Sequence, residues 1–328
     1  MIFFILCLII VIADETFDSN VLRPAQISGI TQLDNEIFVK NREGMLFSHS
    51  ADGSIRHLID KRASGRFFLL GPIALPKSDR VVVAPIQRRG FNFLADKNVA
   101  LQIFSAAENW KPVEGINIPS GTSQLFADEE DAIIAFGTDG IYRATSNQLE
   151  AHDDNKKDDF GGLLSFLVKP ESDFARITPD DLVLNSPMYA AADTDGTKLY
   201  VYSRGEVIKV ELDGSKKAKI LKRVALEGDS SERASLAQSG PFLVLAREDS
   251  GIEIYNADTL SLITKIDDIS SSTPRFLQGS TVGDSRVTVV FNNGDFGIVD
   301  CEAKSWICLL YTSPSPRDLS TSRMPSSA

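Results

Sequence analysis

The chain has 328 residues, of which 43% are hydrophobic and 24% are charged, and 45 acidic against 34 basic side chains give it a formal net charge of −11. With a mean hydropathy of −0.05, this is the composition of a globular protein, and it excludes a disordered chain, a collagen-like chain and a polytopic membrane protein. The acidic balance argues against nucleic acid or an anionic membrane surface as the main partner, because phosphates would be repelled.

The first 13 residues, MIFFILCLIIVIA, are apolar and uncharged, and Asp14 follows them. They are too few to span a bilayer, which takes about 20 residues. Val11 and Ala13 are small residues placed for a cut before Asp14, so we interpret segment 1–13 as a secretory signal peptide. The alternatives are a longer hydrophobic segment with a missing start and a buried strand. Residues 14–26 form a lead-in, and the predicted location is extracellular, periplasmic or the lumen of the secretory pathway.

From residue 27 onward, short β-branched or aromatic runs are separated by turns that contain glycine. Residues 132–136 lead through Gly137–Gly140 into 141–143, and residues 242–246 lead through a glycine-containing turn into 252–255. Glycine supplies the positive φ that tight turns need, so each pair of runs predicts a β-hairpin. Sustained helical periodicity is nearly absent, which predicts an all-β fold.

The hairpins return at a near-regular interval. The first central residues of their leading runs are Ile37, Val81, Ile133, Leu199, Phe242 and Val287. Successive positions differ by 44, 52, 66, 43 and 45 residues, and a four-stranded propeller blade takes about 40 to 45. We therefore predict a β-propeller of about six to eight four-stranded blades over residues 27–308. A pair of β-sandwiches is the alternative, although it would repeat nearer every 10 residues.

This pattern resembles the PQQ-like and WD40-like propeller superfamily over about Ile27 to Trp306. The turns Ser50–Gly53 and Gly137–Gly140 also resemble fragments of the Asp-box of sialidase-like and sortilin-like propellers. The resemblance implies blades that stack on one another because none can bury both faces alone. Hydrolases and quinoproteins with this fold place carboxylates and arginines from separate blades around the central channel.

Two of the steps are longer than one blade. The first is lengthened by residues 87–98, between the second and third strands of a blade, and the second by residues 151–187, between one blade and the next. Connections of these two kinds emerge on the same face of an up-and-down blade. We therefore expect one insertion-bearing face, which is where repeat proteins often bind partners.

The first insertion combines basic and aromatic side chains, Arg88, Arg89, Phe91 and Phe93. In an acidic protein such a loop is suited to a protein or peptide ligand, and we predict these four residues as the partner-binding site. The alternative is that the phenylalanines fold back onto the blade and the arginines are solvated.

Other candidate sites are better interpreted as structural. In segment 153–159, Lys157 stands where a calcium loop needs an oxygen ligand, so a solvated loop is favoured. Thr178–Asp181 fits a helix start, and Asp193–Gly196 fits a turn better than a metal site. His49 is expected at the surface or in a hydrogen bond rather than acting as a base. We predict no catalytic residue, no metal site and no cofactor.

The last stretch, Leu309 to Ala328, is rich in Ser, Pro, Thr and Arg and has little to bury. Its core, YTSPSPRD, resembles translated sequencing-adapter read-through, which implies a non-native disordered tail over residues 309–328. A disordered native tail is the alternative. On the first interpretation the natural chain continues beyond Trp306, the last blade lacks its final strand, and contact with a membrane would come only through a missing C-terminal segment.

Two functions follow from these features. The favoured one is a secreted or membrane-tethered propeller that acts as a non-enzymatic platform for protein or other ligands. The alternative is a propeller enzyme of the hydrolase or quinoprotein type, with its site in the central channel. The first is favoured because the sequence has no His-Glu-x-x-His, no Gly-x-Ser-x-Gly and no phosphate-binding glycine-rich loop.

Overall fold

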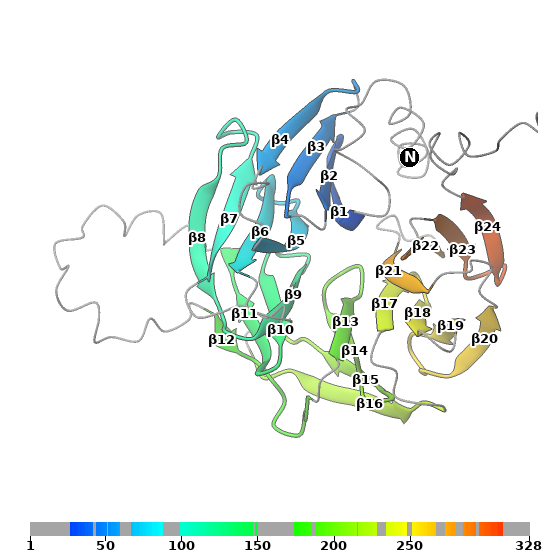
Figure 1. Ribbon diagram of the computed structural model, residues 1–328. Helices are drawn as coiled ribbons and strands as arrows, with labels where there is room; N and C mark the ends of the chain where they lie inside the picture. Colours follow the sequence, from blue (N-terminus) through cyan, green and yellow to red (C-terminus); the bar gives the residue numbers. More distant parts are fainter. Residues whose placement is uncertain are drawn as a thin grey trace, which may run out of the picture.

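The computed structural model describes residues 27–41, 44–50, 52–59, 67–87, 99–146, 148–149, 174–184, 188–214, 216–227, 234–247, 251–266, 273–279, 285–292 and 295–310. Their strands form six four-stranded antiparallel sheets arranged around a centre (Figure 1). Each sheet uses four strands that are consecutive in the sequence, so each is a propeller blade built from one stretch of chain. The predicted all-β propeller is confirmed with six blades, and the alternative of two β-sandwiches is wrong.

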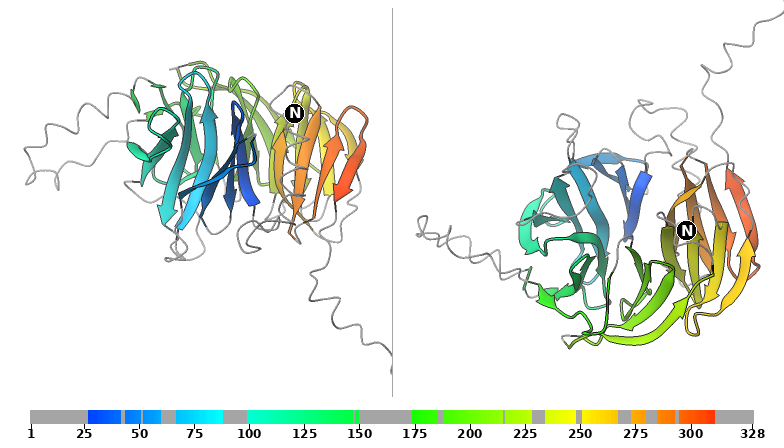
Figure 2. Two further views of the ribbon diagram at one scale, coloured as in Figure 1. Left: turned by 90° about the horizontal axis from the view of Figure 1, so that it is seen from above. Right: turned by 60° about the horizontal axis from the view of Figure 1, so that its bottom comes forward.

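The blades follow one another along the chain, and within each blade the first strand is innermost and the fourth is outermost (Figure 2). Their strands are, for blade 1, β1 (Ile27–Leu33), β2 (Glu36–Asn41), β3 (Leu46–Ser50) and β4 (Ile55–Ile59); for blade 2, β5 (Phe67–Leu75), β6 (Arg80–Gln87), β7 (Val99–Ser105) and β8 (Val113–Ile118); for blade 3, β9 (Thr122–Ala127), β10 (Ile133–Gly137), β11 (Gly140–Ala144) and β12 (Ala175–Arg176); for blade 4, β13 (Met188–Ala192), β14 (Lys198–Ser203), β15 (Glu206–Glu211) and β16 (Lys219–Ala225); for blade 5, β17 (Ala234–Ser239), β18 (Phe242–Arg247), β19 (Gly251–Asn256) and β20 (Leu262–Ile266); and for blade 6, β21 (Pro274–Gly279), β22 (Arg286–Phe291), β23 (Phe296–Asp300) and β24 (Ser305–Leu310).

The hairpins that the sequence predicts are the second and third strands of each blade. All six residues that mark the repeat lie in second strands. In blade 4, Arg204 and Gly205 form the turn between β14 and β15 with φ of 46° and 80°. Two successive residues with positive φ give a turn whose twist matches that of the strands on either side.

The hydrophobic core lies between neighbouring blades. Between blades 1 and 2, Phe38 and Leu46 pack with Leu69 and Phe104, and all four side chains are buried. Trp110 completes this layer, with its ring centroid 5.1 Å from that of Phe38. Similar layers join blades 2 and 3, 3 and 4, 4 and 5, and 5 and 6. Blades 2 to 5 therefore each bury both of their faces against two neighbouring blades.

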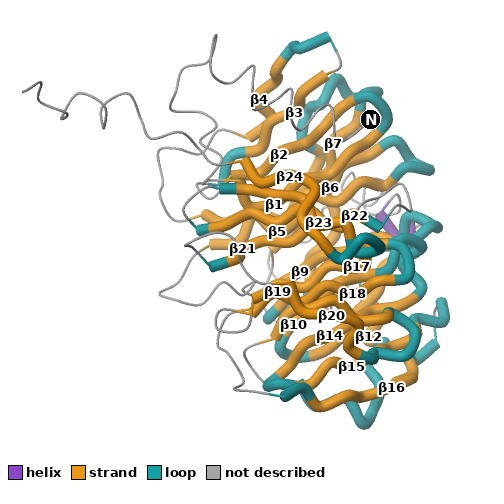
Figure 3. The backbone as a smooth tube through the Cα atoms, turned by 90° about the vertical axis from the view of Figure 1, so that its right-hand side faces the viewer, coloured by secondary structure: helices purple, strands orange, loops and turns teal. Residues whose placement is uncertain are grey.

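Polar contacts join the inner strands of successive blades. The Gln124 side chain of β9 donates to the Ala190 carbonyl of β13 at 3.1 Å and accepts from the Ala190 N–H at 2.7 Å. Between blades 5 and 6, the N–H of Leu277 donates to Ser235 Oγ at 3.0 Å. These bonds hold the strands side by side around the ring, with the loops at the strand ends (Figure 3).

In five of the six blades a β-bulge lies between the third strand and the outermost strand. In blades 1, 2, 4, 5 and 6 the register shifts within the pairing of the third and fourth strands. In blade 4 this shift leaves Leu221 without an opposite residue, because Lys209 pairs with Lys222 and Val210 pairs with Ile220. A bulge bends its strand and increases the local twist, so the outer strands are splayed from the inner ones.

The two long insertions leave from opposite faces of the ring, so the predicted shared face is wrong. The two residues of β12 pair with β11 and complete blade 3. Residues 145–174 therefore connect a third strand to a fourth, whereas residues 88–98 connect a second strand to a third. Because successive strands alternate in direction, these two kinds of connection leave a blade on opposite faces. A strand as short as β12 has no apolar run by which the sequence could mark it.

Blade 6 has four strands, so the expectation that the last blade lacks its final strand is wrong. Gly297 of β23 pairs with Leu309 of β24, and Phe296 pairs with Leu310. The final strand thus extends two residues past the predicted end of the propeller at residue 308. The predicted signal peptide, lead-in and the rest of the predicted tail, residues 1–26 and 311–328, lie outside the described residues.

Candidate interaction surface

The four predicted partner-binding residues lie outside the described part of the chain. Arg88, Arg89, Phe91 and Phe93 fall between the end of β6 and the start of β7. Their predicted role therefore stays a prediction. Segment 153–159, which is predicted to be a solvated loop rather than a calcium site, also falls outside the described residues.

Two other candidates from the sequence have structural roles. Asp193–Gly196 forms the first hairpin turn of blade 4, in which Gly196 N–H donates to the Asp193 carbonyl at 3.1 Å and Asp193 Oδ1 accepts from Lys198 N–H at 2.9 Å. This confirms the turn interpretation. His49 is buried in β3, and desolvation by burial lowers its pKa below 6.5, so the neutral form is favoured.

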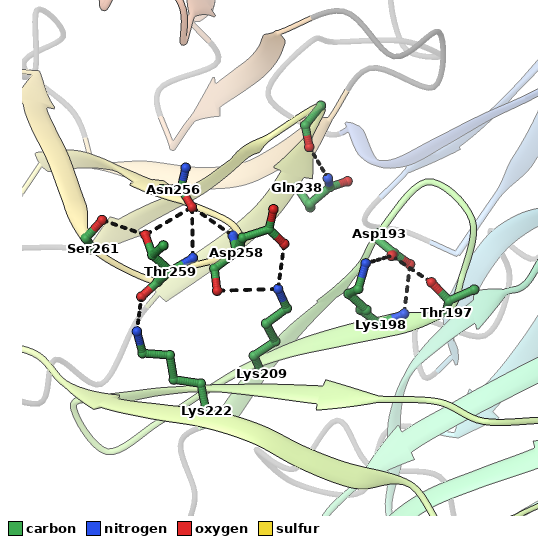
Figure 4. A network of polar contacts seen from close by, with 11 residues as sticks. Asp193, Thr197, Lys198, Lys209, Lys222, Gln238, Asn256, Asp258, Thr259 and Ser261 are labelled. Atoms are coloured by element: carbon green, nitrogen blue, oxygen red, sulfur yellow. Dashed lines mark hydrogen bonds and ion pairs between the residues drawn. The ribbon is translucent and has the colours of Figure 1, made fainter.

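Polar contacts join strands β15 and β16 of blade 4 to the turn between β19 and β20 of blade 5 (Figure 4). The buried Lys209 of β15 donates to Asp258 Oδ1 in the turn of blade 5 at 2.8 Å. This bond holds the pKa of Asp258 below its ordinary value. Lys209 Nζ also lies 5.8 Å from the ring centroid of Tyr200, whose pKa is raised by burial first and by the charges of Asp193 and Asp258 second. The network ties one blade to the next.

A second charged network is buried inside blade 5. Arg247 Nη2 donates to Glu253 Oε1 at 2.6 Å, and the Tyr255 hydroxyl donates to Glu253 Oε2 at 2.9 Å. Arg247 also donates to the Glu227 carbonyl at 3.2 Å. The three side chains are no more than 6% exposed, so this carboxylate is committed to bonds within the fold.

One stretch of the chain is rich in basic residues. Between residues 216 and 226 the chain carries five basic side chains and no acidic one, in a protein of net charge −11. We call this group, together with the neighbouring Arg176, the basic edge. Its members are Arg176, Lys216, Lys217, Lys219, Lys222 and Arg223.

Strand β16 positions most of the basic edge. It is the outermost strand of blade 4, and its partly buried Ile220 and Val224 pack against the neighbouring cores. Lys222 is directed towards blade 5, where it donates to the Thr259 carbonyl. Arg223 is directed towards blade 3, where it donates to the Asp181 carbonyl. Positive charge is therefore presented on both faces of this strand.

Residues 177–182 lie alongside the start of β16. The Thr178 hydroxyl accepts from Ile141 N–H at 2.8 Å, and Ala218 N–H donates to the Ile177 carbonyl at 2.7 Å. Leu182 N–H donates to the Pro179 carbonyl at 3.2 Å, which closes a turn. The predicted helix start at Thr178–Asp181 is thus wrong, because the hydroxyl that would cap a helix bonds to the main chain of β11.

A shallow hollow of about 220 Å³ lies where this turn meets blade 4. It is lined by Arg176, Thr178, Pro179, Asp180, Leu182 and Lys217. Lys217 Nζ donates to both Asp180 oxygens, at 2.6 and 2.7 Å, and this bond holds the pKa of Asp180 below its ordinary value. Both side chains are more than half exposed, so solvent screens their pairing and a second carboxylate can compete for Lys217.

Exposed apolar side chains accompany the charges. Among the described residues, four large hydrophobic side chains are exposed. Leu221 lies within β16, and Val183 follows Leu182, which lines the hollow. Val183 is 64% exposed and Leu221 41%. Exposed apolar groups next to charge are a common composition for a protein-binding surface. The run Lys216–Arg223 was visible in the sequence, but its position on an outer edge was not.

The fold is shared with proteins of known structure, although the sequence is not. No family model matches the chain, and no curated protein is significantly similar to it. A chain in the crystal structure of a mitotic checkpoint complex has a TM-score of 0.53 and 10% identity, covering 85% of this chain and 77% of that one. Sqt1 of Chaetomium thermophilum, bound to the N-terminus of the ribosomal protein L10, has a TM-score of 0.55 and 12% identity, covering 89% and 76%. These similarities show a shared β-propeller fold.

Proposed function

We propose that this propeller is a non-enzymatic protein-binding platform and that the basic edge, with Val183 and Leu221, is its binding surface. The observation that carries the proposal is the concentration of basic side chains, whose carboxylate partners Asp180, Asp181, Glu206 and Asp213 are exposed and can be exchanged for those of a binding partner. An acidic protein gathers six basic side chains beside exposed apolar ones along one outer strand and the adjoining turn. Charged groups placed in this way steer a complementary partner and fix its orientation.

The fold supports the same conclusion. One structural neighbour is described as bound to the N-terminus of a ribosomal protein, and the other belongs to a multiprotein complex. Buried or partly buried carboxylates of this chain also have structural roles. Glu253 bonds to Arg247 and Tyr255, and Asp131 accepts the N–H groups of Lys77 and Ser78 at 3.2 and 2.6 Å, which joins blades 2 and 3. Groups held in this way support the fold rather than acid–base chemistry.

We further propose that the platform is secreted or membrane-tethered, on the basis of the apolar segment 1–13. Among the described residues, no helix combines the length and apolarity needed to cross a bilayer. Expression in a secreting host followed by N-terminal sequencing tests the proposal. A mature product that begins at Asp14 supports export, and an intracellular product that retains Met1 contradicts it.

Site-specific photo-crosslinking tests the binding surface. A photoreactive amino acid would replace Val183 or Leu221, with Leu262 and Ile307 as matched controls. The controls are 55% and 44% exposed and lie on outer strands of other blades. We expect one adduct, identified by mass spectrometry and reproduced with the purified partner, at the first two positions only.

Two outcomes of this experiment would count against the proposal. Equal crosslinking at all four positions would indicate unspecific contact, and no adduct at any position would contradict a protein-binding role for this surface. The double variant R88A/R89A serves as a comparison. If it abolishes capture while the basic edge is intact, the binding site lies on the first insertion instead.

A further inference from the structure

We propose that β16 binds an acidic, extended segment of a partner protein as an additional strand. The inference rests on the proposed function and specifies its partner. The added strand would bond to the main chain of β16, and its carboxylates would meet Lys217, Lys219, Lys222 and Arg223.

The outer edge of β16 is available for such pairing. The order of the sheet is β13-β14-β15-β16, so β16 has a neighbouring strand on one side only. Within the described ranges, no main-chain hydrogen bond joins residues 219–225 to anything other than β15. Alternate N–H and C=O groups of an edge strand point away from its sheet and can template a further strand.

Length and charge distinguish β16 from the other outer strands. It has seven residues, whereas β4 and β20 have five, β8 and β24 have six and β12 has two. Three of its seven residues are basic and none is acidic. Its bulge is not distinctive, because four other blades have one at the same place.

The distribution of charge selects an acidic partner strand. A second copy of β16 would place like charges opposite one another, which is destabilising. Lysines on an edge therefore prevent self-pairing while favouring a strand of opposite charge. Lys219 is exposed, whereas Lys222 and Arg223 bond to main-chain carbonyls on opposite faces of the strand. Arg223 also lies 3.9 Å from Asp181 and 4.0 Å from Glu206, and both of these carboxylates are exposed. Carboxylates of an added strand would compete with them for Arg223 on one face and would meet Lys222 on the other, so acidic side chains on both faces are expected.

Two further features extend the contact. Leu221, at the bulge, offers an apolar surface in the middle of the strand. The hollow between Arg176 and Lys217 lies at its beginning, where one more carboxylate would replace Asp180 as the partner of Lys217. The expected ligand is therefore acidic along its length and has one apolar residue near its middle.

The probe is a fluorescein-labelled peptide of about ten residues, mainly glutamate with valine and one central leucine, added to the whole chain. Fluorescence anisotropy should show saturable binding that weakens between about 50 and 500 mM salt. The variant K219E should bind several-fold more weakly, because one attraction becomes a repulsion. K265E, on the outer strand β20, is the matched control and should bind as the unchanged protein does.

A second peptide, N-methylated at alternate amides, keeps its charges but cannot pair as a strand. It should lose binding, and hydrogen exchange should show that the unmodified peptide protects the amides of β16 but not those of β20. Equal binding of the methylated peptide would overturn the proposal, because charge alone would then explain the affinity. Equal weakening by K265E would overturn it as well.

The inference and the proposed function can fail separately. If photo-crosslinking at Val183 and Leu221 captures a partner that the acidic peptide does not displace, the strand-addition proposal is wrong and the platform proposal stands. If neither position yields an adduct, the platform proposal fails, whatever the peptide does.

Discussion

Replacing Glu253 by leucine should destabilise the protein strongly, because Glu253 balances a buried charge. Its carboxylate accepts from Arg247 at 2.6 Å and from Tyr255 at 2.9 Å, and the side chains of the ion pair are 3% and 6% exposed. Without it, Arg247 keeps a buried positive charge whose remaining partner is the Glu227 carbonyl. Breaking a buried pair on one side costs about 3–5 kcal/mol, a large part of the 5–15 kcal/mol by which proteins are ordinarily stable.

The assay is equilibrium unfolding in urea, monitored by tryptophan fluorescence, on E253L, R247M and the double variant. We expect the double variant to lose less than half of what E253L loses, because removing both charges leaves no unpaired ion. The exposed pair of Asp213 and Lys216, whose side chains are 67% and 79% exposed, provides the control. D213N should change stability by less than about 0.5 kcal/mol. A double variant whose loss equals the sum of the single losses would refute the reasoning.

Three further predictions concern the junctions and the buried tyrosines. Burial raises the pKa of Tyr200 and Tyr255 well above 10.0, so the folded state keeps protons that the unfolded chain releases. The free energy of unfolding should therefore be unaffected below about pH 10 and should fall above it, by about 1.4 kcal/mol per pH unit for each tyrosine. In urea titrations the variant Y200F/Y255F should lose this pH dependence. G279A should destabilise by about 1–3 kcal/mol in thermal unfolding, because a Cβ there would lie 1.9 Å from the Gln238 carbonyl oxygen of the adjacent blade, and an unchanged midpoint would contradict this close approach. Q124L should lower stability by about 1–3 kcal/mol in urea titrations, because both main-chain groups of Ala190 lose their partner. Q124E should also destabilise, because a carboxylate oxygen would then face the Ala190 carbonyl oxygen.

The sequence predicted the fold because each blade contains one strong local signal. The second strand is covered on both faces by neighbouring blades and therefore appears as a continuous apolar run, such as Val81 to Ala84, all fully buried. In most blades the third strand follows the second after a short turn. The sequence therefore shows a hairpin in each blade, and the spacing of these hairpins shows the blade repeat. First and fourth strands are less uniformly buried and more variable in length, and their boundaries follow from pairing rather than from hydrophobicity.

The wrong placement of the second insertion has this same cause. Blade 3 is closed by Ala175 and Arg176, two exposed residues held by pairing with Tyr142 and Arg143. Nothing in their side chains distinguishes them from a loop. Because a face is assigned by counting strands, missing one strand reverses the face assigned to the connection that leads into it. The expected common binding face depended on that count and failed with it.

The basic edge shows why a surface is harder to predict than a fold. The run from Lys216 to Arg223 is conspicuous in an acidic sequence, but its meaning depends on where the strand lies. On a strand covered by its neighbours such charges would be buried and would need a partner, as the buried Lys209 of β15 bonds to Asp258. On an outer strand they remain solvated, prevent pairing with a like strand and leave main-chain groups available to an unlike one. The same basic residues would thus destabilise a buried strand, whereas on an outer strand they can recognise a partner. The position of a strand within its sheet decides between the two, and that position depends on pairing between distant parts of the chain. Charge reversal at Lys219, compared with the same change at Lys265, isolates the effect of the strand, because the two substitutions are chemically identical and differ only in the strand that carries them.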